Sequence, residues 1–305
     1  MSKVTIKAPA TVANLVCGFD ILGLCLEHPY DVMELRLLNE KKVVINTTGD
    51  YVLSSDPANN AAGAPLIEML KEIDEAIGFE LTINKQIKPG SGIGSSAASA
   101  AGAVFAANHL LDHRFSNLDL VRFAMHGEKV ATGVKHADNI APCIYGGISL
   151  IRSVFPLDIV HIPPPELYVS VVHPQIEVKT ADARQILRKE VLLKDAIKQW
   201  GNIAGLVAGL LQHDYDLISR SLEDVIIEPV RSILIPGFDT LKKRSIAAGA
   251  LGGGISGSGP SVFMLSKDRQ TADAVAGEMQ QVYRQLSIDH HIYVSPISKG
   301  VSVID

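Results

Sequence analysis

The chain has 305 residues, of which 47% are hydrophobic and 20% charged, so it can bury a sizeable core and is too apolar to be disordered. Its formal net charge of -5 provides no broad basic field for nucleic acid or an anionic membrane, which favours a small-molecule partner. Cys17, Cys25 and Cys143 show no C-x-x-C spacing, and no segment approaches the roughly 20 apolar residues of a membrane span. We therefore expect a globular cytoplasmic protein, and the length favours two domains with a cleft between them.

In the first half of the chain, two segments alternate apolar and polar residues and are predicted to be strands. They are Met33-Glu-Leu-Arg-Leu37 and Phe79-Glu-Leu-Thr-Ile83, each expected to bury one face. Between them, apolar residues from Leu66 to Ile77 recur at helical spacing, and Gly78 is placed as the C-terminal cap of this helix.

Two helices are expected next. Ser95 and Ser96 precede a run of small, helix-favouring residues, which predicts a helix with a hydroxyl at its N-cap. A second helix is predicted to begin at Ser116 and to end near Gly133, so that Glu128 lies in its last turns.

The proline-rich segment from Phe155 to Pro165 is expected to interrupt regular structure, and it divides the chain into domains 1–155 and 156–305. The second domain is predicted to contain a strand near 167–172, helices at 192–211 and 241–248, a strand ending at Leu265, and a helix through 272–286. Strands and helices interleave without a strict βαβ rhythm, which favours the α+β class over a doubly wound sheet.

The segment Pro89 to Ser96 is the strongest local signal for a ligand. Its three alternating glycines stand directly before a helix, where missing β-carbons let backbone N–H groups approach a polyanion, and its hydroxyls could bind phosphate or magnesium. The chain has no Gly-Lys-Ser or Gly-Lys-Thr tripeptide of a Walker loop, and Gly92 and Gly94 are too close for a dinucleotide fingerprint. Alone, this loop indicates an anion site or, equally, a flexible turn before a helix.

Two further motifs give the loop a context. They are the segment 8–24, Ala-Pro-Ala-Thr-Val-Ala-Asn-Leu-Val-Cys-Gly-Phe-Asp-Ile-Leu-Gly-Leu, and the segment 251–261, Leu-Gly-Gly-Gly-Ile-Ser-Gly-Ser-Gly-Pro-Ser. With the loop, and in this order, they resemble the three signature segments of the GHMP kinases. The first motif and the His136 to Gly147 segment are most similar to the homoserine kinase family, although Val16 stands where that family has a glycine.

This resemblance implies a fold and an activity. The fold would be a two-domain GHMP kinase, with an N-terminal domain like ribosomal protein S5 domain 2 and a ferredoxin-like C-terminal domain. The activity would be ATP- and Mg²⁺-dependent phosphorylation of the L-homoserine hydroxyl to O-phospho-L-homoserine, in threonine biosynthesis.

The resemblance also assigns residues to roles. ATP would be bound by Pro89, Gly90, Ser91, Gly92, Ile93, Gly94, Ser95, Ser96, Ala97, Ala98 and Asn60. Homoserine would be bound by Asn14, Asp20, His136, Asn139, Arg184 and Arg231. Magnesium would be held by Glu128 and Ser96, and the catalytic residues would be Asn139, Glu128 and Ser96.

Each assignment has a chemical reason. Planar guanidinium groups suit an α-carboxylate, and Asp20 suits an α-ammonium. Asn139 can orient a hydroxyl but cannot act as a base, so either the γ-phosphate or the adjacent Asp138 would accept the proton. Lys88 and Asn60 are weaker candidates for the nucleotide side.

Structural alternatives remain open for these residues. Without the family resemblance, Glu128 would be interpreted as a solvated residue on a helix face, Asp20 as a turn residue, and either arginine as an ordinary surface residue. The segment Gly252 to Gly259 either supports the phosphate loop or forms a β-turn without a ligand.

Functional alternatives also remain open. Within the superfamily, the acceptor could be mevalonate or a sugar, and outside catalysis the chain could be a nucleotide-binding module. A homodimer is neither indicated nor excluded by these patterns.

Overall fold

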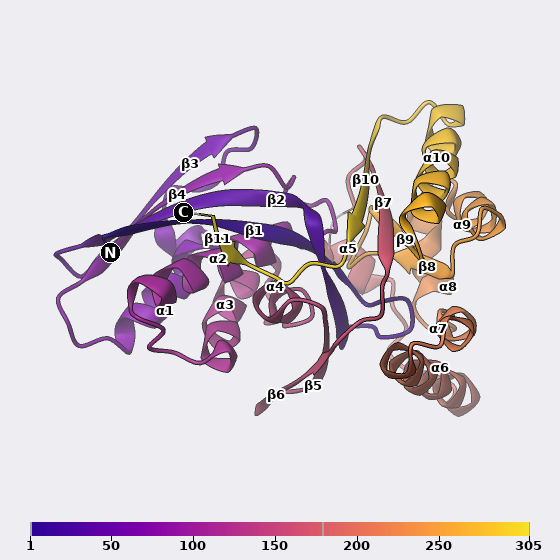
Figure 1. The fold of residues 1–305 in the computed structure, drawn as a ribbon, viewed down its shortest axis with the longest axis horizontal. Coiled ribbons are helices and arrows are strands. Elements are labelled where there is room, and N and C mark those ends of the chain that lie inside the picture. Colours follow the sequence, from indigo (N-terminus) through magenta and orange to yellow (C-terminus); the bar gives the residue numbers. More distant parts are fainter. Residues whose placement is uncertain (1, 179, 305) are drawn as a thin grey trace.

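The computed structural model describes residues 2 to 178 and 180 to 304, and it is an α+β fold with two separate sheets (Figure 1). The strands are β1 Lys3–Ala13, β2 Leu22–Leu38, β3 Val43–Gly49, β4 Gly78–Lys85, β5 Ile148–Val154, β6 Leu157–Ile162, β7 Tyr168–Pro174, β8 Gly252–Ile255, β9 Val262–Ser266, β10 His290–Pro296 and β11 Ser302–Val303. The helices are α1 Gly63–Lys71, α2 Ser95–Leu110, α3 Asn117–Thr132, α4 Ile140–Tyr145, α5 Thr180–Gln185, α6 Leu193–Gln212, α7 Tyr215–Ser221, α8 Glu228–Arg231, α9 Phe238–Ala247 and α10 Arg269–Gln285, with short 3-10 turns at Pro57–Asn59 and Ser232–Leu234.

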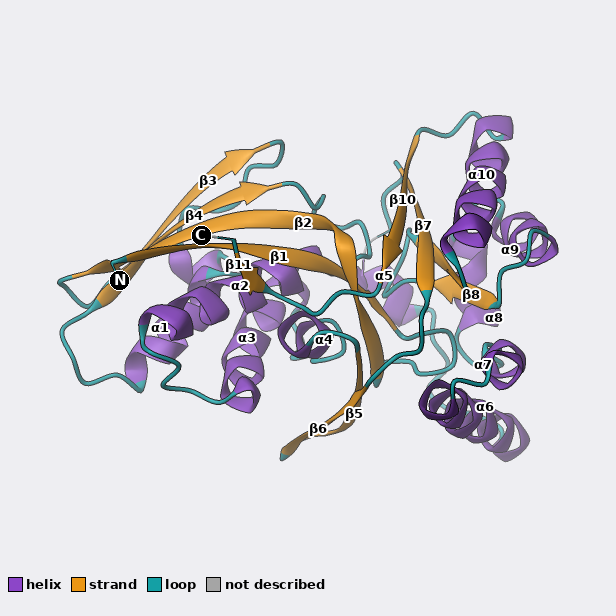
Figure 2. Ribbon diagram, viewed as in Figure 1, coloured by secondary structure: helices purple, strands orange, loops and turns teal. Residues whose placement is uncertain are grey.

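The larger sheet is built from the first part of the chain and its C-terminal end. Its main strand order is β11-β1-β2-β4-β3, and β5 and β6 extend from β2. Helices α1 to α4 lie on one side of this sheet (Figure 2). In β2 the predicted alternation is confirmed, because Met33 and Leu35 are buried while Glu34 and Arg36 lie at least partly in solvent.

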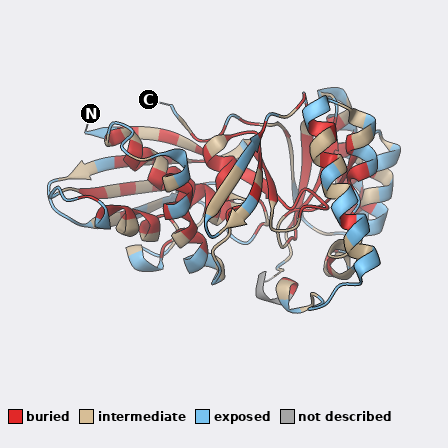
Figure 3. Cartoon of the chain, turned by 90° about the horizontal axis from the view of Figure 1, so that it is seen from below, coloured by how far each residue is buried: buried red, intermediate tan, exposed pale blue. Residues whose placement is uncertain are grey.

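The smaller sheet, in the order β10-β7-β9-β8, forms the core of the second part of the chain with α9 and α10. The predicted final helix is confirmed as α10, with Ala272, Val275, Met279 and Val282 buried, but it ends at Gln285 and Leu286 is 44% exposed. Figure 3 shows the same division, with buried residues on the inner faces of the helices and exposed residues outside. Among the described helices, none is long and apolar enough to cross a membrane.

Three local expectations need correction. Gly78 does not cap a helix: α1 ends at Lys71, and Gly78 begins β4, where a β-carbon would lie 2.2 Å from the Lys42 carbonyl oxygen. The N-cap of α2 is Gly94 rather than a serine, because the chain enters this helix with a positive φ of 68° that glycine adopts at no cost. The proline-rich segment carries β6 and is therefore not wholly irregular.

The second predicted helix is confirmed at both ends. Ser116 and Asp119 form a reciprocal capping box, and Gly133 ends α3 with a φ of 82°. The division at residue 156 stays a prediction. Both β6 and β11, which follow it in sequence, hydrogen-bond within the larger sheet.

Candidate active site

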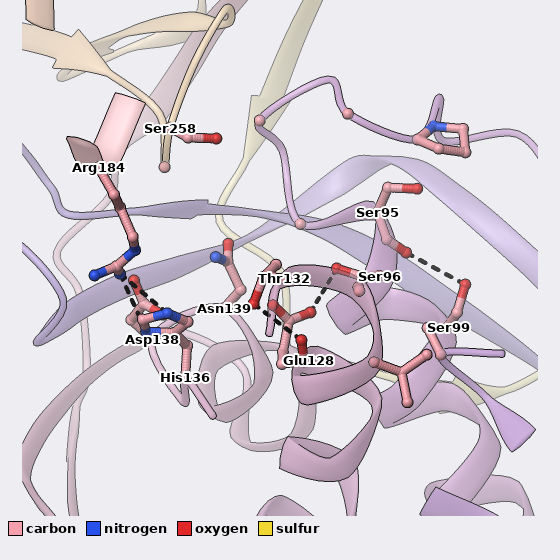
Figure 4. Close-up of a pocket in the computed structure, with 18 of the residues that line it drawn as sticks. Ser95, Ser96, Ser99, Glu128, Thr132, His136, Asp138, Asn139, Arg184 and Ser258 are labelled. Carbon is pink, nitrogen blue, oxygen red and sulfur yellow. Dashed lines mark hydrogen bonds between the residues drawn. The ribbon is translucent and has the colours of Figure 1, made fainter. Parts of the chain in front are cut away.

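A cavity of about 370 Å³ lies where elements of the two sheets' domains meet (Figure 4). Most of the predicted site residues line it: Asn14, Asp20, Asn60, Pro89, Gly90, Gly92, Gly94, Ser95, Ser96, Glu128, His136, Asn139, Arg184 and Arg231. Four predicted residues do not line it and are buried: Ser91 and Ile93 within the loop, and Ala97 and Ala98 in α2. The predicted residues, which span more than 200 positions of sequence, are thus gathered at one site.

The glycines of the phosphate loop adopt conformations and contacts that side chains would prevent. Gly90, Gly92 and Gly94 have φ values of 74°, 83° and 68°. A β-carbon on Gly92 would lie 2.5 Å from the Gly259 carbonyl oxygen, and one on Gly94 would lie 2.0 Å from Thr11 Oγ1. The loop leads directly into the 16-residue helix α2, whose N-terminal N–H groups and dipole favour an anion.

The second glycine-rich segment supports this loop from the other domain. Ser256 Oγ donates to the Gly92 carbonyl at 2.7 Å, and Ser261 Oγ donates to the Ser91 carbonyl at 2.6 Å. The segment was expected either to support the phosphate loop or to form a β-turn without a ligand, and these contacts favour the supporting role. Two hydrogen bonds to backbone carbonyls fix the outer half of the loop without occupying its N–H groups.

A buried ion pair fixes the inner half of the loop, and the sequence reasoning missed it. Lys85 Nζ bonds to Asp31 and also donates to the Ser95 carbonyl at 2.8 Å and to Ser99 Oγ at 3.0 Å. Asp31 Oδ1 in turn accepts the backbone N–H groups of Gln86 and Ile87. Burial lowers the pKa of Lys85, while its bonds to Asp31 oppose that shift.

A sequence signal for Lys85 existed. The alternation Phe79, Leu81, Ile83 continues to residue 85, which places Lys85 on the buried face of β4.

Glu128 and Ser96 form an oxygen-rich pair at the end of the cavity that the loop 89–96 lines. Ser96 Oγ donates to Glu128 Oε1 at 2.5 Å (Figure 4), and Glu128 is only 5% exposed. Burial raises the pKa of this carboxyl, and the Ser96 hydrogen bond opposes the rise. The solvated-helix alternative for Glu128 is therefore wrong.

These donors fit a magnesium ion. Mg²⁺ prefers hard oxygen ligands and is commonly held by one or two carboxylates together with substrate phosphates and water. Among the residues that the structure describes, no group of three or more acidic, histidine or cysteine side chains is placed to hold a metal ion.

Asn139 lies between the two ends of the cavity. It stands at the start of α4, where its Oδ1 accepts a hydrogen bond from Thr11 Oγ1 at 2.8 Å. Figure 4 shows it between the Ser96–Glu128 pair and the Arg184–His136 group. The fixed Oδ1 orients the amide, so that its Nδ2 is available as a donor in the cavity.

Asp138 is buried at the same point of the cavity. Burial, with a smaller contribution from the nearby charge of Asp20, raises the pKa of its carboxyl to about 7.

Charged residues from two domains meet at the other end of the cavity. Arg184 Nη2 donates to both carboxylate oxygens of Asp20, at 2.9 and 3.0 Å, and lies 3.0 Å from His136 Nε2. Because an arginine nitrogen can only donate, His136 Nε2 is the acceptor and the imidazole is neutral. Burial lowers the pKa of His136, which agrees with this assignment.

Arg231 completes the charged end and is not a surface arginine, since it is 3% exposed. Its Nε and Nη1 donate to the carbonyls of Ala183 and Gly257, at 2.9 and 3.0 Å. Desolvation and the neighbouring Arg184 lower the pKa of its guanidinium to about 10. The ring of Phe19, a residue to which sequence reasoning gave no role, lies 4.8 Å from the Arg231 guanidinium and 5.7 Å from that of Arg184.

The loop that carries Asn14 and Asp20 is unusual in its backbone. Asn14, Val16 and Asp20 have φ values of 74°, 66° and 62°, a region that a β-branched residue such as Val16 rarely adopts. Asn14 Nδ2 donates to the Gly257 carbonyl at 2.8 Å, and Asn14 Oδ1 accepts the Asp20 N–H. The valine that replaces the family's glycine therefore preserves the turn at the cost of local strain.

The side chains of Asn60 and Lys88, both predicted for the nucleotide side, form hydrogen bonds to other parts of the chain. Asn60 Oδ1 accepts the N–H groups of Ala62 and Gly63, and its Nδ2 donates to the Ser54 carbonyl, so its amide largely organises the start of α1. Lys88 donates to Gln175 at 2.7 Å and does not line the cavity.

Comparisons with known proteins identify the family. The model of the GHMP kinases N terminal domain matches residues 62–147, and that of the GHMP kinases C terminal domain matches residues 206–285.

Individual relatives extend this match over the whole chain. The homoserine kinase of Chloroherpeton thalassium is 45% identical over all of both chains, and that of Methanocella arvoryzae is 38% identical over all of this chain and 98% of the relative. A crystal structure of homoserine kinase from Cytophaga hutchinsonii superposes with a TM-score of 0.95 at 45% identity, covering 100% of this chain and 98% of that one. The chain therefore belongs to the GHMP kinase family and, within it, groups with the homoserine kinases.

Proposed function

We propose that this chain transfers the γ-phosphoryl group of ATP to the side-chain hydroxyl of L-homoserine, giving O-phospho-L-homoserine. The observation that carries the proposal is the layout of one cavity. An anion loop with Ser96 and Glu128 lies at one end, acidic and basic groups suited to a zwitterion lie at the other, and Asn139 lies between them. Phosphoryl transfer requires this kind of positioning, with the acceptor hydroxyl in line with the terminal phosphate.

At the phosphate end, we assign the triphosphate to the backbone N–H groups of the loop and the first turn of α2. Ser96 and Glu128 would hold Mg²⁺, which when bound neutralises charge on the phosphate oxygens. The Ser256, Ser261 and Lys85 contacts reach the loop through its carbonyls and therefore do not occupy its N–H groups. The site needs little reorganisation before the nucleotide binds.

At the amino-acid end, we assign the ammonium group to Asp20 and the carboxylate to Arg184 and Arg231. In the structure Arg184 pairs with Asp20, so the two ionic groups of a bound zwitterion would take over partners that otherwise satisfy each other. Asn14 and His136 help to hold this end. Galactose and other sugars carry no carboxylate for the two arginines to bind, which disfavours them as substrates.

At the reacting centre, we assign Asn139 to orienting the acceptor hydroxyl. An amide cannot accept the proton, so the γ-phosphate serves as the acceptor in this proposal, and Asp138 is the alternative.

A coupled assay of ADP release with L-homoserine, mevalonate, L-threonine and galactose tests the substrate assignment. We expect homoserine to give the highest kcat/KM by at least tenfold. Turnover that ignores homoserine and responds to mevalonate or galactose would contradict it.

A further inference from the structure

Thr11 lies behind the cavity and connects two parts of its wall. It follows an irregularity in the pairing of β1 with β2, between Pro9 and Thr11, and it is fully buried. Its backbone N–H donates to the Ile93 carbonyl of the phosphate loop at 3.2 Å, and its Oγ1 donates to Asn139 Oδ1 at 2.8 Å. One residue therefore contacts both the loop and the side chain that we assign to the acceptor hydroxyl.

Asn139 does not use its amide for the helix that it precedes. An asparagine at an N-cap normally accepts a backbone N–H of the first helical turn with its Oδ1. The described contacts of α4 include no such side-chain bond, and the backbone of Asn139 is already helical, with a φ of -94° and a ψ of -35°. Its Oδ1 accepts the Thr11 hydroxyl instead, and the residue lines the cavity (Figure 4). This hydrogen bond therefore orients the amide in the cavity rather than capping α4.

A glycine makes room for this contact. A β-carbon on Gly94 would lie 2.0 Å from Thr11 Oγ1 and 3.1 Å from Asn139 Oδ1, so the backbone at the N-cap of α2 lies directly against both oxygens. Because protein interiors are close-packed, the Thr11 and Asn139 side chains can move little relative to the end of the phosphate loop. The position of the amide is thus tied to the position of the loop.

The hydrogen bond also decides which end of the amide faces the substrate. A hydroxyl group has one proton, and the buried Thr11 proton has its acceptor in Asn139 Oδ1. Turning the amide over would bring Nδ2 to Thr11 and would take this acceptor away, which is unfavourable for a buried donor. The amide is therefore fixed with Nδ2, rather than Oδ1, on the side of the cavity.

We propose that Thr11 is a positioning residue for the phosphoryl transfer, an inference that rests on the proposed function. With Thr11 holding Oδ1, Asn139 Nδ2 donates to the oxygen of the homoserine hydroxyl, whose own proton then points at a γ-phosphate oxygen. The hydroxyl oxygen bonds to the γ-phosphorus, the bond from that phosphorus to the β–γ bridging oxygen breaks, ADP leaves, and the proton passes to the transferred phosphoryl group. An amide turned the other way would accept the hydroxyl proton and hold it away from the phosphate.

The first test is steady-state kinetics of variants at position 11. Thr11→Val keeps the shape of the side chain and removes the hydroxyl, and we expect kcat to fall about 30- to 100-fold through misplacement of the acceptor. KM for ATP and for homoserine should each change less than about fivefold, because Thr11 does not line the cavity. Thr11→Ser restores the hydroxyl and should keep kcat within about threefold of the wild type.

Thr48→Val is the matched control. It removes the hydroxyl of another strand threonine, whose Oγ1 donates to the Ile83 carbonyl at 3.4 Å, and Thr48 does not line the cavity. This variant should keep kcat within about twofold of the wild type, because no group of the proposed site depends on its hydrogen bond.

The second test asks whether Thr11 acts through Asn139. In an Asn139→Ala background the amide is absent, so adding Thr11→Val should lower kcat by less than about threefold further. A merely structural role of Thr11 would lower kcat by the same factor in both backgrounds. Thr11→Ala, which also removes the methyl group, should show the same coupling and takes the place of Thr11→Val if thermal unfolding shows that variant to be unfolded.

The outcomes separate this inference from the proposed function. A wild-type chain that does not phosphorylate homoserine overturns the proposed function and this inference with it. A wild-type chain that does phosphorylate homoserine leaves three results that overturn this inference alone: a folded Thr11→Val at the wild-type rate, a Thr11→Ser variant as slow as Thr11→Val, or independent effects of the substitutions at residues 11 and 139.

Discussion

The two ends of the cavity are organised in different ways. The phosphate end is held by neutral and ionic bonds that lie behind the loop, from Lys85 within its own domain and from Ser256 and Ser261 across the cleft. The amino-acid end is held by its own functional groups, since Arg184 and Asp20 bind each other. Under the proposed function, the difference means a preformed nucleotide site and a substrate site whose charges would exchange partners when the amino acid binds.

Removing the carboxylate to which we assign magnesium should have the largest effect on turnover. We expect Glu128→Ala to lower kcat by about 10³-fold or more. Without this carboxylate the proposed Mg²⁺ would be lost, and the charge on the transferring phosphoryl group would not be neutralised. Steady-state assays over a range of Mg²⁺ concentrations measure this, with Ser96→Ala as a milder companion. If Glu128→Ala retained the wild-type rate, the magnesium assignment would be wrong.

Breaking the support behind the loop should chiefly reduce stability. Lys85→Met leaves the Asp31 charge buried without its ammonium partner, so the free energy of unfolding should fall by about 3 to 5 kcal/mol. Urea unfolding measures it. As a control, Lys88→Met removes only a bond to Gln175 that lies partly in solvent and should cost about 1 kcal/mol or less. Equal losses in the two variants would refute a special role for Lys85.

Substitution at the amino-acid end should affect binding of one substrate only. Arg231→Leu removes a charged hydrogen bond to the carboxylate, typically about 1.5 to 3 kcal/mol, so KM for homoserine should rise roughly 10- to 150-fold. KM for ATP should change little, because Arg231 lies at the far end of the cavity. Bisubstrate kinetics separate the two constants, and a parallel rise in both would contradict the division into two ends.

The smallest effect on turnover is expected at Asp138. If the γ-phosphate accepts the proton, Asp138→Asn should keep kcat within about tenfold, whereas loss of a general base costs 10²-fold or more.

Asp138 should also make the free energy of unfolding depend on pH. The pKa of Asp138 is higher in the folded chain, about 7 against 3.8, so its contribution to stability falls as pH rises through this range. Between pH 5 and pH 8, the wild type should lose about 2 to 3 kcal/mol relative to Asp138→Asn, measured by urea unfolding.

Local patterns in the sequence predicted local structure well. The alternation around Met33 and the start of a helix at Ser116 depend on neighbours only a few residues away, and both are observed. The start of α2 was misjudged because two serines favour an N-cap, while the loop geometry requires glycine there.

Contacts between distant segments were harder to predict. The pairing of Arg184 with Asp20 spans 164 positions, and neither residue's surroundings reveal it. Lys85 was missed for a different reason: a lysine at the end of a strand usually lies in solvent, and only the continued alternation of β4 indicates burial. Residue roles at both ends depended on the family resemblance rather than on periodicity.

The most direct measurement is phosphorus NMR of the products formed from ATP, Mg²⁺ and L-homoserine. We predict a new phosphomonoester signal from O-phospho-L-homoserine that grows in step with ADP and is absent with Glu128→Ala. Release of ADP with inorganic phosphate alone, or no ATP consumption in the presence of homoserine, would contradict the assignment of the cavity to this transfer.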